Sequence, residues 1–256
     1  MKELILVAQE TTVYGKDLYG KKSLHILLKK LCEIRGIRWI RILYCYPEEI
    51  YDELIETIRD EKKICHYLDI PIQHASDHIL KRMGRRTSKQ ELIDIVGKLR
   101  KEIPDIVLRT TLITGFPGET EEDHEELKEF VDEMEFDRLG VFTYSPEENT
   151  PAAEMADQVP EEVKEERRDE LMELQQEISY DRGQDRIGQE LLVMIEGKVA
   201  DESAYIGRTY GDAPKVDGYI FVQTGELLMT GDFAKVRVTG ALEYDLIGVL
   251  SDEYTE

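Results

Sequence analysis

The stretch LRTTLITGFPGETEEDHEEL, residues 108–127, holds one complete strand–turn–helix unit. Its apolar first half continues a β-type run that begins at Ile106, and a helical pattern begins after Thr120, a residue type favoured at helix starts. Between them stand Gly115 and Gly118, which permit the backbone angles of a tight turn. The stretch therefore predicts a β-strand joined directly to an α-helix.

Units of the same kind lie on both sides of this stretch. The expected strands are 4–8, 37–46, 67–70, 106–113 and 139–144. The helical patterns between them begin near Ser23, Pro47, Ser76, Ser88 and Thr120. Helices between consecutive strands are typical of a parallel sheet with right-handed crossovers. Because five strands do not comfortably close a barrel, residues 1–155 are expected to form a partial, open parallel β/α barrel of the α/β class.

The chain changes character after residue 155. Residues 156–186 are expected to form a connector and a long charged linking helix. Residues 187–256 carry short strand patterns separated by Gly and Asp turns, which predict a small antiparallel all-β barrel. This last segment contains thirteen acidic and five basic residues.

Composition excludes several classes of protein. The 256 residues include 55 acidic and 33 basic side chains, a formal charge of −22, so the chain is a poor generic nucleic-acid binder and a basic partner protein is the easier expectation. No apolar stretch is long enough to span a membrane. The three cysteines, Cys32, Cys45 and Cys65, are too far apart for a disulfide framework or a close-spaced metal motif, which favours buried thiols in a reducing, cytoplasmic compartment.

Functional residues of parallel α/β barrels lie at the carboxyl ends of the strands. The polar residues there include Gln9, Glu10, Gln73 and Ser76, and position alone leaves a ligand contact and an ordinary structural role open. Arg109 lies inside an expected strand, so it needs a carboxylate from the protein or from a ligand. The glycine turn at 115–118 is compatible with a tight turn alone or with a flat ligand lying against the backbone.

Several longer strings resemble a known family. LILVAQETTVYGKDLYG (4–20), YLDIPIQHASDHILKRMGRR (67–86) and the stretch at 108–127 are similar to the radical-SAM methylthiotransferases, and within them to the enzymes that modify a ribosomal protein. YIGRTYGDAPKVDGYIFV (205–222) and GDFAKVRVTGALEYDLIG (231–248) resemble the TRAM barrel of that family. The resemblance implies a sheet of radical-SAM type followed by a TRAM-like barrel.

The resemblance also implies an activity. Such an enzyme places a methylthio group on the β-carbon of an aspartate in the small-subunit ribosomal protein S twelve, using S-adenosylmethionine and two 4Fe–4S clusters. One cluster supplies the low-potential electron that cleaves S-adenosylmethionine, and the other carries the sulfur to be transferred. The cofactor-binding residues that it assigns are Gln9, Glu10, Gln73, Ser76, Arg109, Gly115, Pro117 and Gly118. Among them Gln9 and Glu10 would lie near the methionine amino group, and Arg109 and the glycine turn near the carboxylate and adenine ends.

One departure from the family pattern is decisive. The CxxxCxxC loop that binds a cluster is absent, and the three cysteines cannot replace it because cluster ligation needs thiolates converging on one site. We therefore expect the first strand, the cluster loop and the sulfur-cluster domain to lie upstream of Met1, and we expect this chain alone to be inactive, with no catalytic or metal-binding residue of its own. Strand 4–8 would then be an unpaired sheet edge, which favours self-association.

Two alternatives remain open. One is a sibling enzyme that modifies tRNA, and the other is a non-catalytic module that only binds a ribosomal protein. A TRAM barrel that grips RNA should be basic, whereas this segment is acidic, so RNA is not an expected partner. The candidate contacts to a basic ribosomal protein are Glu190, Glu196, Asp201, Glu202, Asp212 and Asp217.

Overall fold

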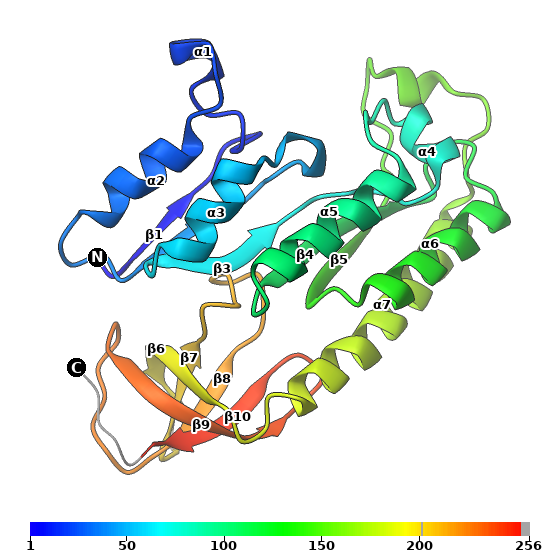
Figure 1. The fold of residues 1–256 in the computed structure, drawn as a ribbon. Helices are drawn as coiled ribbons and strands as arrows, with labels where there is room; N and C mark the ends of the chain where they lie inside the picture. The colour runs from blue at the N-terminus through cyan, green and yellow to red at the C-terminus, as the bar shows by residue number, and fades with distance from the viewer. Residues whose placement is uncertain (201, 252–256) are drawn as a thin grey trace.

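The computed structural model describes residues 1–200 and 202–251, and its first part is an open parallel sheet. Its strands are β1 (Glu3–Leu6), β2 (Trp39–Ile42), β3 (Ile64–Asp69), β4 (Val107–Thr114) and β5 (Arg138–Thr143). They pair in sequence order, every neighbouring pair is parallel, and the two edges do not meet (Figure 1). The predicted open α/β sheet is confirmed.

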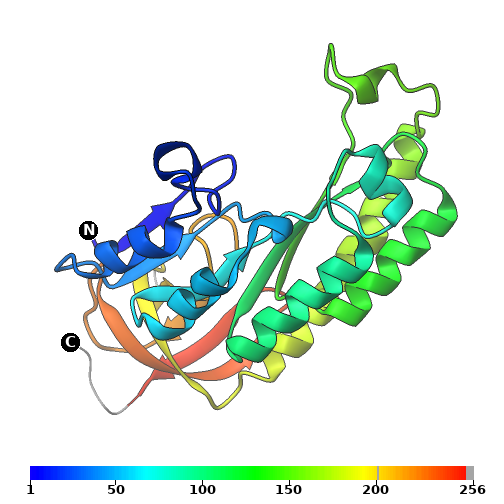
Figure 2. The same ribbon diagram turned by 45° about the horizontal axis from the view of Figure 1, so that its top comes forward.

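The helices between these strands cover one face of the sheet, and the second domain lies on the other side (Figures 1 and 2). They are α1 (Lys16–Tyr19), α2 (Leu24–Cys32), α3 (Asp52–Asp60), α4 (Asp77–Arg82), α5 (Lys89–Glu102) and α6 (Glu121–Met134), with the short 3₁₀ turn η1 (Pro47–Glu49); a second 3₁₀ turn, η2 (Pro151–Glu154), follows β5. Helices α5 and α6 begin at capping boxes, Ser88 with Glu91 and Thr120 with Asp123. The main apolar core lies between this helical layer and the sheet.

The second domain is a small closed barrel. Its strands are β6 (Glu190–Lys198), β7 (Ala204–Arg208), β8 (Ile220–Gln223), β9 (Phe233–Ala241) and β10 (Leu246–Leu250), in the order β10-β8-β7-β6-β9. Four of its pairings are antiparallel, but β8 and β10 pair in parallel. The predicted small all-β barrel is confirmed, and only its closing pair departs from antiparallel pairing, because five strands that alternate in direction around a closed ring must leave one parallel pair.

Helix α7 (Glu161–Gln184) connects the two domains. It packs beside α6 and against β5 and β4, and Leu171 and Ile178 on it join the main core of the sheet. Its end reaches the barrel, where Gly183 lies against Ala241. The predicted linking helix is thus also part of the wall of the first domain. Among the helices that the structure describes, none is both long and apolar enough to cross a membrane.

The face of the sheet opposite the helices is called its inner face. The barrel covers the half of this face that lies towards the amino-terminal ends of the strands. Arg41 on β2 donates from Nη1 to the backbone oxygen of Tyr210, at 2.7 Å, and Glu3 on β1 pairs with Arg208 of β7 at 2.6 Å. Trp39 packs edge-on against Phe233 of β9, with ring centroids 4.9 Å apart. These contacts leave the carboxyl-terminal ends of the strands as the accessible part of the inner face.

Candidate functional site

A cleft of about 460 Å³ lies at the carboxyl-terminal ends of the strands. It is lined by residues that follow β1, β2 and β3 and by the turn after α4: Glu10, Tyr46, Glu48, Glu49, Gln73, Met83, Gly84, Arg85 and Arg86. Two of the predicted residues, Glu10 and Gln73, are therefore brought together, because parallel strands deliver their ends to one edge of the sheet. Gln9 is exposed next to Glu10.

The Glu10 carboxylate is held by hydrogen bonds from the backbone. Its Oε1 accepts from the N–H of Thr12 at 2.8 Å and also from the Thr12 hydroxyl, and its Oε2 accepts from the N–H of Tyr46 at 2.9 Å. Burial nevertheless raises the pKa of Glu10 above its ordinary value, and the nearby Glu49 acts in the same direction. The cleft thus contains a fixed carboxylate that would gain from a cationic ligand.

Two residues at this edge have left-handed backbone angles that are uncommon outside glycine. Tyr44 has φ 58° and Gln73 has φ 70°. The N–H of Tyr44 donates to the Asp69 carboxylate at 3.2 Å, and Gln73 exchanges backbone hydrogen bonds with Thr111 and Ile113 of β4. Because β4 and Asp69 hold both backbones in place, the directions of these two strand ends are fixed by the sheet itself.

The turn after α4 contributes two arginines that the sequence analysis did not single out. The Arg85 guanidinium lies 4.5 Å from the centroid of the Tyr46 ring, and its Nη2 donates to Glu48 at 3.2 Å. Arg86 is exposed and has no carboxylate partner among the described residues. The sequence could have indicated them, because two adjacent arginines directly after Gly84 are unusual in so acidic a chain.

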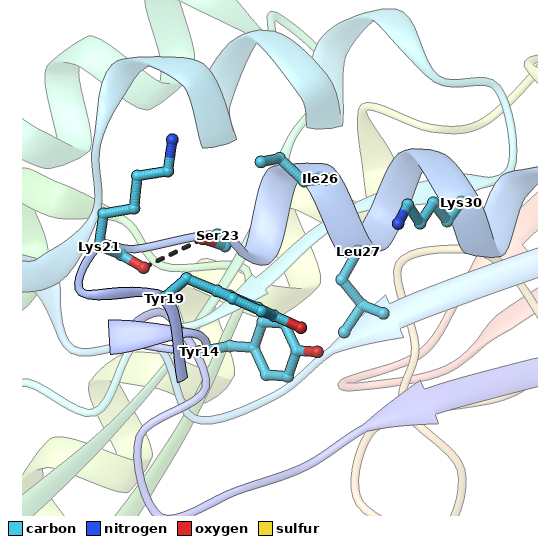
Figure 3. Close-up of a pocket in the computed structure, with 7 residues that line it drawn as sticks. All are labelled: Tyr14, Tyr19, Lys21, Ser23, Ile26, Leu27 and Lys30. Carbon is cyan, nitrogen blue, oxygen red and sulfur yellow. Dashed lines mark hydrogen bonds between the residues drawn. The ribbon is translucent and has the colours of Figure 1, made fainter. Parts of the chain in front are cut away.

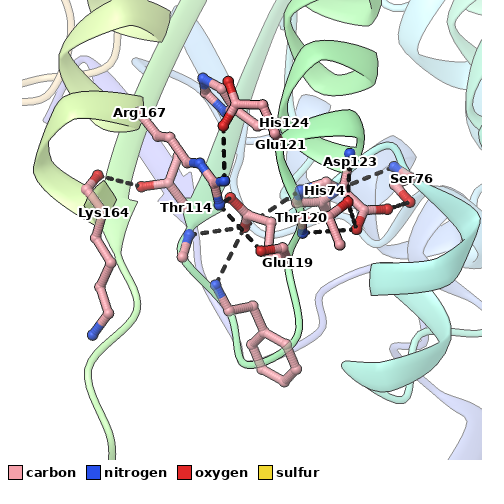
Figure 4. Close-up of polar contacts among 12 residues, drawn as sticks. His74, Ser76, Thr114, Glu119, Thr120, Glu121, Asp123, His124, Lys164 and Arg167 are labelled. Carbon is pink, nitrogen blue, oxygen red and sulfur yellow. Dashed lines mark hydrogen bonds and ion pairs between the residues drawn. The ribbon is translucent and has the colours of Figure 1, made fainter. Parts of the chain in front are cut away.

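The glycine turn between β4 and α6 is built around a buried carboxylate. Glu119 accepts from the N–H of Gly115 at 2.8 Å and of Phe116 at 3.2 Å, and Arg167 of α7 pairs with it at 2.9 Å (Figure 4). Its side chain has no exposed surface. The turn and α7 therefore form one hydrogen-bonded unit.

A side chain at either glycine of this turn would collide with another side chain of the protein. Gly115 has φ 71°, and a Cβ there would lie 2.1 Å from Cγ of Lys164. Gly118 has φ 85°, and a Cβ there would lie 2.6 Å from the guanidinium carbon of Arg82. The same Arg82 donates to the backbone oxygen of Pro117 at 2.8 Å. The structure thus shows a tight turn with protein side chains against both glycines, and a ligand contact at this turn stays a prediction.

Ser76 was predicted to lie at a ligand-facing strand end, and the contacts observed for its side chain are with the protein. Ser76 is buried, and its hydroxyl donates to Oδ1 of Asp123 at 2.5 Å (Figure 4). Burial opposes ionisation of Asp123, but hydrogen bonds from Ser76, Thr120 and His78 outweigh it and lower the pKa of Asp123 to about 2. Ser76 thus links the segment after β3 to α6.

Arg109 receives its carboxylates from the protein. Its Nη1 lies 2.8 Å from Oδ1 of Asp69, and its Nε lies 3.3 Å from Oδ1 of Asp217 in the barrel domain. The hydroxyl of Tyr67 also donates to Asp217, at 2.8 Å. Of the two partners that the sequence left open for Arg109, the structure shows the protein carboxylate, so a direct ligand contact is not its observed role.

The predicted docking acids of the barrel divide into two groups. Asp212 and Asp217 are corrected: their side chains are buried against the sheet, where Asp212 pairs with Arg138 at 2.6 Å. They lie inside the domain interface because they pair with buried arginines on the inner face of the sheet, which would otherwise be unpaired charges. Glu190 and Glu202 are exposed, Glu196 is half-buried and pairs with Arg208, and Asp201 lies outside the described residues.

The cysteines do not fit an iron–sulfur cluster. Burial raises the pKa of Cys32 to about 11 and that of Cys65 to about 12, and it raises the pKa of Cys45 well above its ordinary value. Cluster ligands must be thiolates that converge on one site. Within residues 1–200 and 202–251, no group of three metal-binding side chains comes together.

A second hollow lies apart from the predicted residues. It has a volume of about 390 Å³ and is formed by α1, α2 and the segment before them (Figure 3). Its lining is Tyr14, Tyr19, Lys21, Ser23, Ile26, Leu27 and Lys30. It contains no acidic side chain and none of the residues assigned from the sequence.

Comparison with known proteins gives two family matches. Residues 2–131 match the radical SAM superfamily, and residues 187–250 match the TRAM domain. The first match covers β1 to β4 and ends within α6, before β5, and the second match covers the whole barrel.

Two curated relatives share high identity with the chain. The ribosomal protein uS12 methylthiotransferase RimO of Lachnoclostridium phytofermentans is 68% identical over 248 residues, covering 97% of this chain and 56% of that protein. RimO of Clostridium botulinum (strain Langeland) is 54% identical over 256 residues, covering 100% of this chain and 57% of that protein. The chain thus spans little more than half the length of these relatives.

Among solved structures, coproporphyrinogen III oxidase (HemN) of Escherichia coli, described as a radical SAM enzyme, is similar in fold. The TM-score is 0.51 at 16% identity, covering 83% of this chain and 50% of that chain. This likeness concerns the fold alone.

Proposed function

Because the chain belongs to the radical SAM superfamily, we propose that it forms part of an enzyme that transfers a methylthio group to an aspartate β-carbon of a small-subunit ribosomal protein. The observation that carries this proposal is 68% identity, across both sheet and barrel, to a uS12 methylthiotransferase. Enzymes of this superfamily use S-adenosylmethionine and a 4Fe–4S cluster, which supplies the electron for its cleavage.

The cleft at the strand ends is the proposed S-adenosylmethionine site. Its volume of about 460 Å³ lies within the range of small-molecule pockets. The Glu10 carboxylate suits the cofactor's ammonium group, Gln73 also lines the cleft, and Gln9 precedes Glu10 in the sequence. In this proposal Ser76, Arg109 and the turn at 115–118 hold the strand ends in place.

The cluster ligands are proposed to come from outside the described residues. This applies to both clusters of the proposed enzyme, since Cys32, Cys45 and Cys65 do not come together in a metal-binding group among the described residues. The chain alone is accordingly expected not to cleave S-adenosylmethionine after anaerobic treatment with iron and sulfide. Production of 5′-deoxyadenosine by the chain alone would contradict this.

A basic ribosomal protein fits the charge of the chain. The net charge of −22 and the exposed acids Glu190 and Glu202 on the barrel favour a basic surface. Attraction of this kind raises the association rate and weakens as salt increases. The same charge disfavours a tRNA substrate, whose phosphates would be repelled.

The proposal can be tested with a chimera. This chain replaces the matching segment of the 68% identical relative, and mass spectrometry measures whether uS12 gains a methylthio group in place of hydrogen. We expect a modified product, and we expect Glu10→Gln in the chimera to reduce the rate at least tenfold because the carboxylate is lost from the cleft. A folded chimera that binds S-adenosylmethionine and leaves uS12 unmodified would contradict the proposal.

A further inference from the structure

The segment after β2 has an uncommon backbone conformation that other parts of the sheet hold in place. Tyr44 has φ 58°, in the left-handed region that residues other than glycine rarely adopt. Its N–H donates to Oδ2 of Asp69 at 3.2 Å, and its backbone oxygen accepts from the N–H of Thr11 at 3.0 Å. Such a conformation persists only where several contacts fix it, and it commonly occurs at functional sites.

Asp69, the last residue of β3, contacts this segment with both its backbone and its side chain. Its backbone oxygen accepts from the N–H of Cys45 at 2.9 Å, while its carboxylate accepts from the N–H of Tyr44. The next N–H along the chain, that of Tyr46, donates to Oε2 of Glu10 at 2.9 Å. Asp69 therefore fixes the segment that presents a hydrogen-bond donor to the carboxylate of the cleft.

The Asp69 carboxylate is itself held by an arginine that also contacts the barrel. Arg109 donates from Nη1 to Oδ1 of Asp69 at 2.8 Å, so each carboxylate oxygen of Asp69 has a partner. The Nε of Arg109 lies 3.3 Å from Oδ1 of Asp217, whose other oxygen accepts from the hydroxyl of Tyr67 at 2.8 Å. These three charged side chains are at most 16% exposed, and loss of one would leave a buried charge without its full set of partners.

We propose that Asp69 is a positioning residue of the cleft and that Asp217 acts on the same cleft through Arg109. Asp69 is not among the residues that line the cleft; it holds the segment 44–46, which in turn holds Glu10 towards an ammonium group. This rests on the proposed function, because the proposed S-adenosylmethionine site is the cleft that contains Glu10. The barrel thereby influences the cofactor site, although none of its described residues lines the cleft.

The alternative is that Asp69, Arg109 and Asp217 only stabilise the fold. Their substitution would then lower the amount of folded protein, and the apparent affinity for every ligand of the cleft would fall by the same factor. A positioning role instead changes the preference between a ligand that carries the ammonium group and one that lacks it. The two roles are therefore separated by comparing two such ligands on the same protein sample.

The test measures binding of S-adenosylhomocysteine and of its deamino analogue, in which hydrogen replaces the α-amino group, to the full chain by isothermal titration calorimetry. We expect the wild type to bind the amino ligand roughly tenfold more tightly, the typical size of a charged hydrogen-bonded contact. Asp69→Asn should reduce this preference to about twofold or less, because its single amide oxygen cannot accept from both Tyr44 and Arg109.

Two further variants test the connection to the barrel. Arg109→Lys and Asp217→Asn should each retain roughly a third of the preference, because the first loses the fork that reaches two carboxylates and the second loses one of them. Asp212→Asn is the matched control. Asp212 is buried in the same loop of the barrel but pairs with Arg138, so its substitution should keep the tenfold preference.

The proposal is overturned if neither ligand binds or if the wild type does not distinguish them. It is also overturned if Asp69→Asn or Asp217→Asn keeps the tenfold preference, or if Asp212→Asn loses it as well. These outcomes leave the proposed methylthio transfer standing, because the chimera tests it separately. A preference that depends on Asp69 and Asp217, together with a folded chimera that leaves uS12 unmodified, would instead contradict the proposed function alone.

Discussion

The two ends of the inner face of the sheet differ in what covers them. At the amino-terminal end, Arg41 and Arg138 are buried against the barrel and paired with its oxygens. At the carboxyl-terminal end, Phe142 of β5 is 61% exposed and Tyr44 is 47% exposed. Charged residues are therefore buried where a second domain satisfies them, and aromatic residues are exposed where no protein covers them.

This difference separates the role of holding the domains together from that of binding a ligand. Burying charged groups costs free energy unless each one finds a partner, so the barrel can seat on the sheet only in the position that pairs them. The exposed aromatic side chains at the other end impose no such requirement, and exposed apolar surface of this kind commonly marks a binding site.

The largest expected loss of stability comes from removing one cation at the amino-terminal end of the inner face, which the barrel covers and which is called the sealed end below. Arg208 lies 2.6 Å from both Glu3 and Glu196 and is 2% exposed. Arg208→Ala should lower the free energy of unfolding by about 3–5 kcal/mol, because it removes the buried cation that pairs with both Glu3 and Glu196 and leaves Arg41 as the remaining partner of Glu3. Urea denaturation followed by circular dichroism measures this loss.

Arg237→Ala is the control for that measurement. Arg237 pairs with Glu190 on the exposed surface of the barrel, where ion pairs contribute little. Its loss should not change the unfolding midpoint measurably. Equal effects of the two substitutions would mean that the barrel contact is not a sealed interface.

A smaller, pH-dependent loss of stability is expected at Asp123, which lies on α6 beside the uncovered carboxyl-terminal ends of the strands. The pKa of Asp123 is lowered to about 2 in the folded protein, so its contribution is present above about pH 4 and is lost as the pH falls from 4 towards 2. Its size is about 2 kcal/mol. Asp123→Asn should remove this part of the acid dependence.

Unfolding free energies measured between pH 2 and pH 6 test this expectation. Asp132→Asn, an exposed position on the same helix, should keep the wild-type slope. A wild-type slope in Asp123→Asn would show that the strand end after β3 is not held by this carboxylate.

The smallest effect is expected at the open face itself. Phe142→Ala should change the free energy of unfolding by no more than about 0.5 kcal/mol, because most of the ring already contacts solvent. Trp39→Ala at the sealed end removes a buried ring packed on Phe233 and should cost several-fold more. Similar losses in a thermal melt would contradict the distinction between the two ends.

Most of the fold follows from local patterns in the sequence. Apolar runs located all five strands of the sheet, and the Ser88 and Thr120 caps located the starts of α5 and α6, because these signals lie within a few residues of each other. The parallel pairing of β8 and β10 was missed, since the residue pattern of a strand does not show its direction.

The candidate site was predictable where it depends on strand ends and not where it depends on distant partners. Glu10 and Gln73 converge because both follow parallel strands. Asp212 was expected on the surface, but its partner Arg138 is 74 positions away, and no neighbouring residue indicates this pairing. The position of Arg85 in the cleft lining likewise depends on contact with Tyr46, which is distant in sequence.

The pairing of Glu3 with Arg208 joins residues 205 positions apart. During synthesis β1 is therefore made long before Arg208, whereas Arg41, the other partner of Glu3, follows it by 38 positions. Contacts over such separations close slowly, because the intervening chain must first be ordered. We expect the contact between β1 and the barrel to form on the translating ribosome only after β7 has been synthesised.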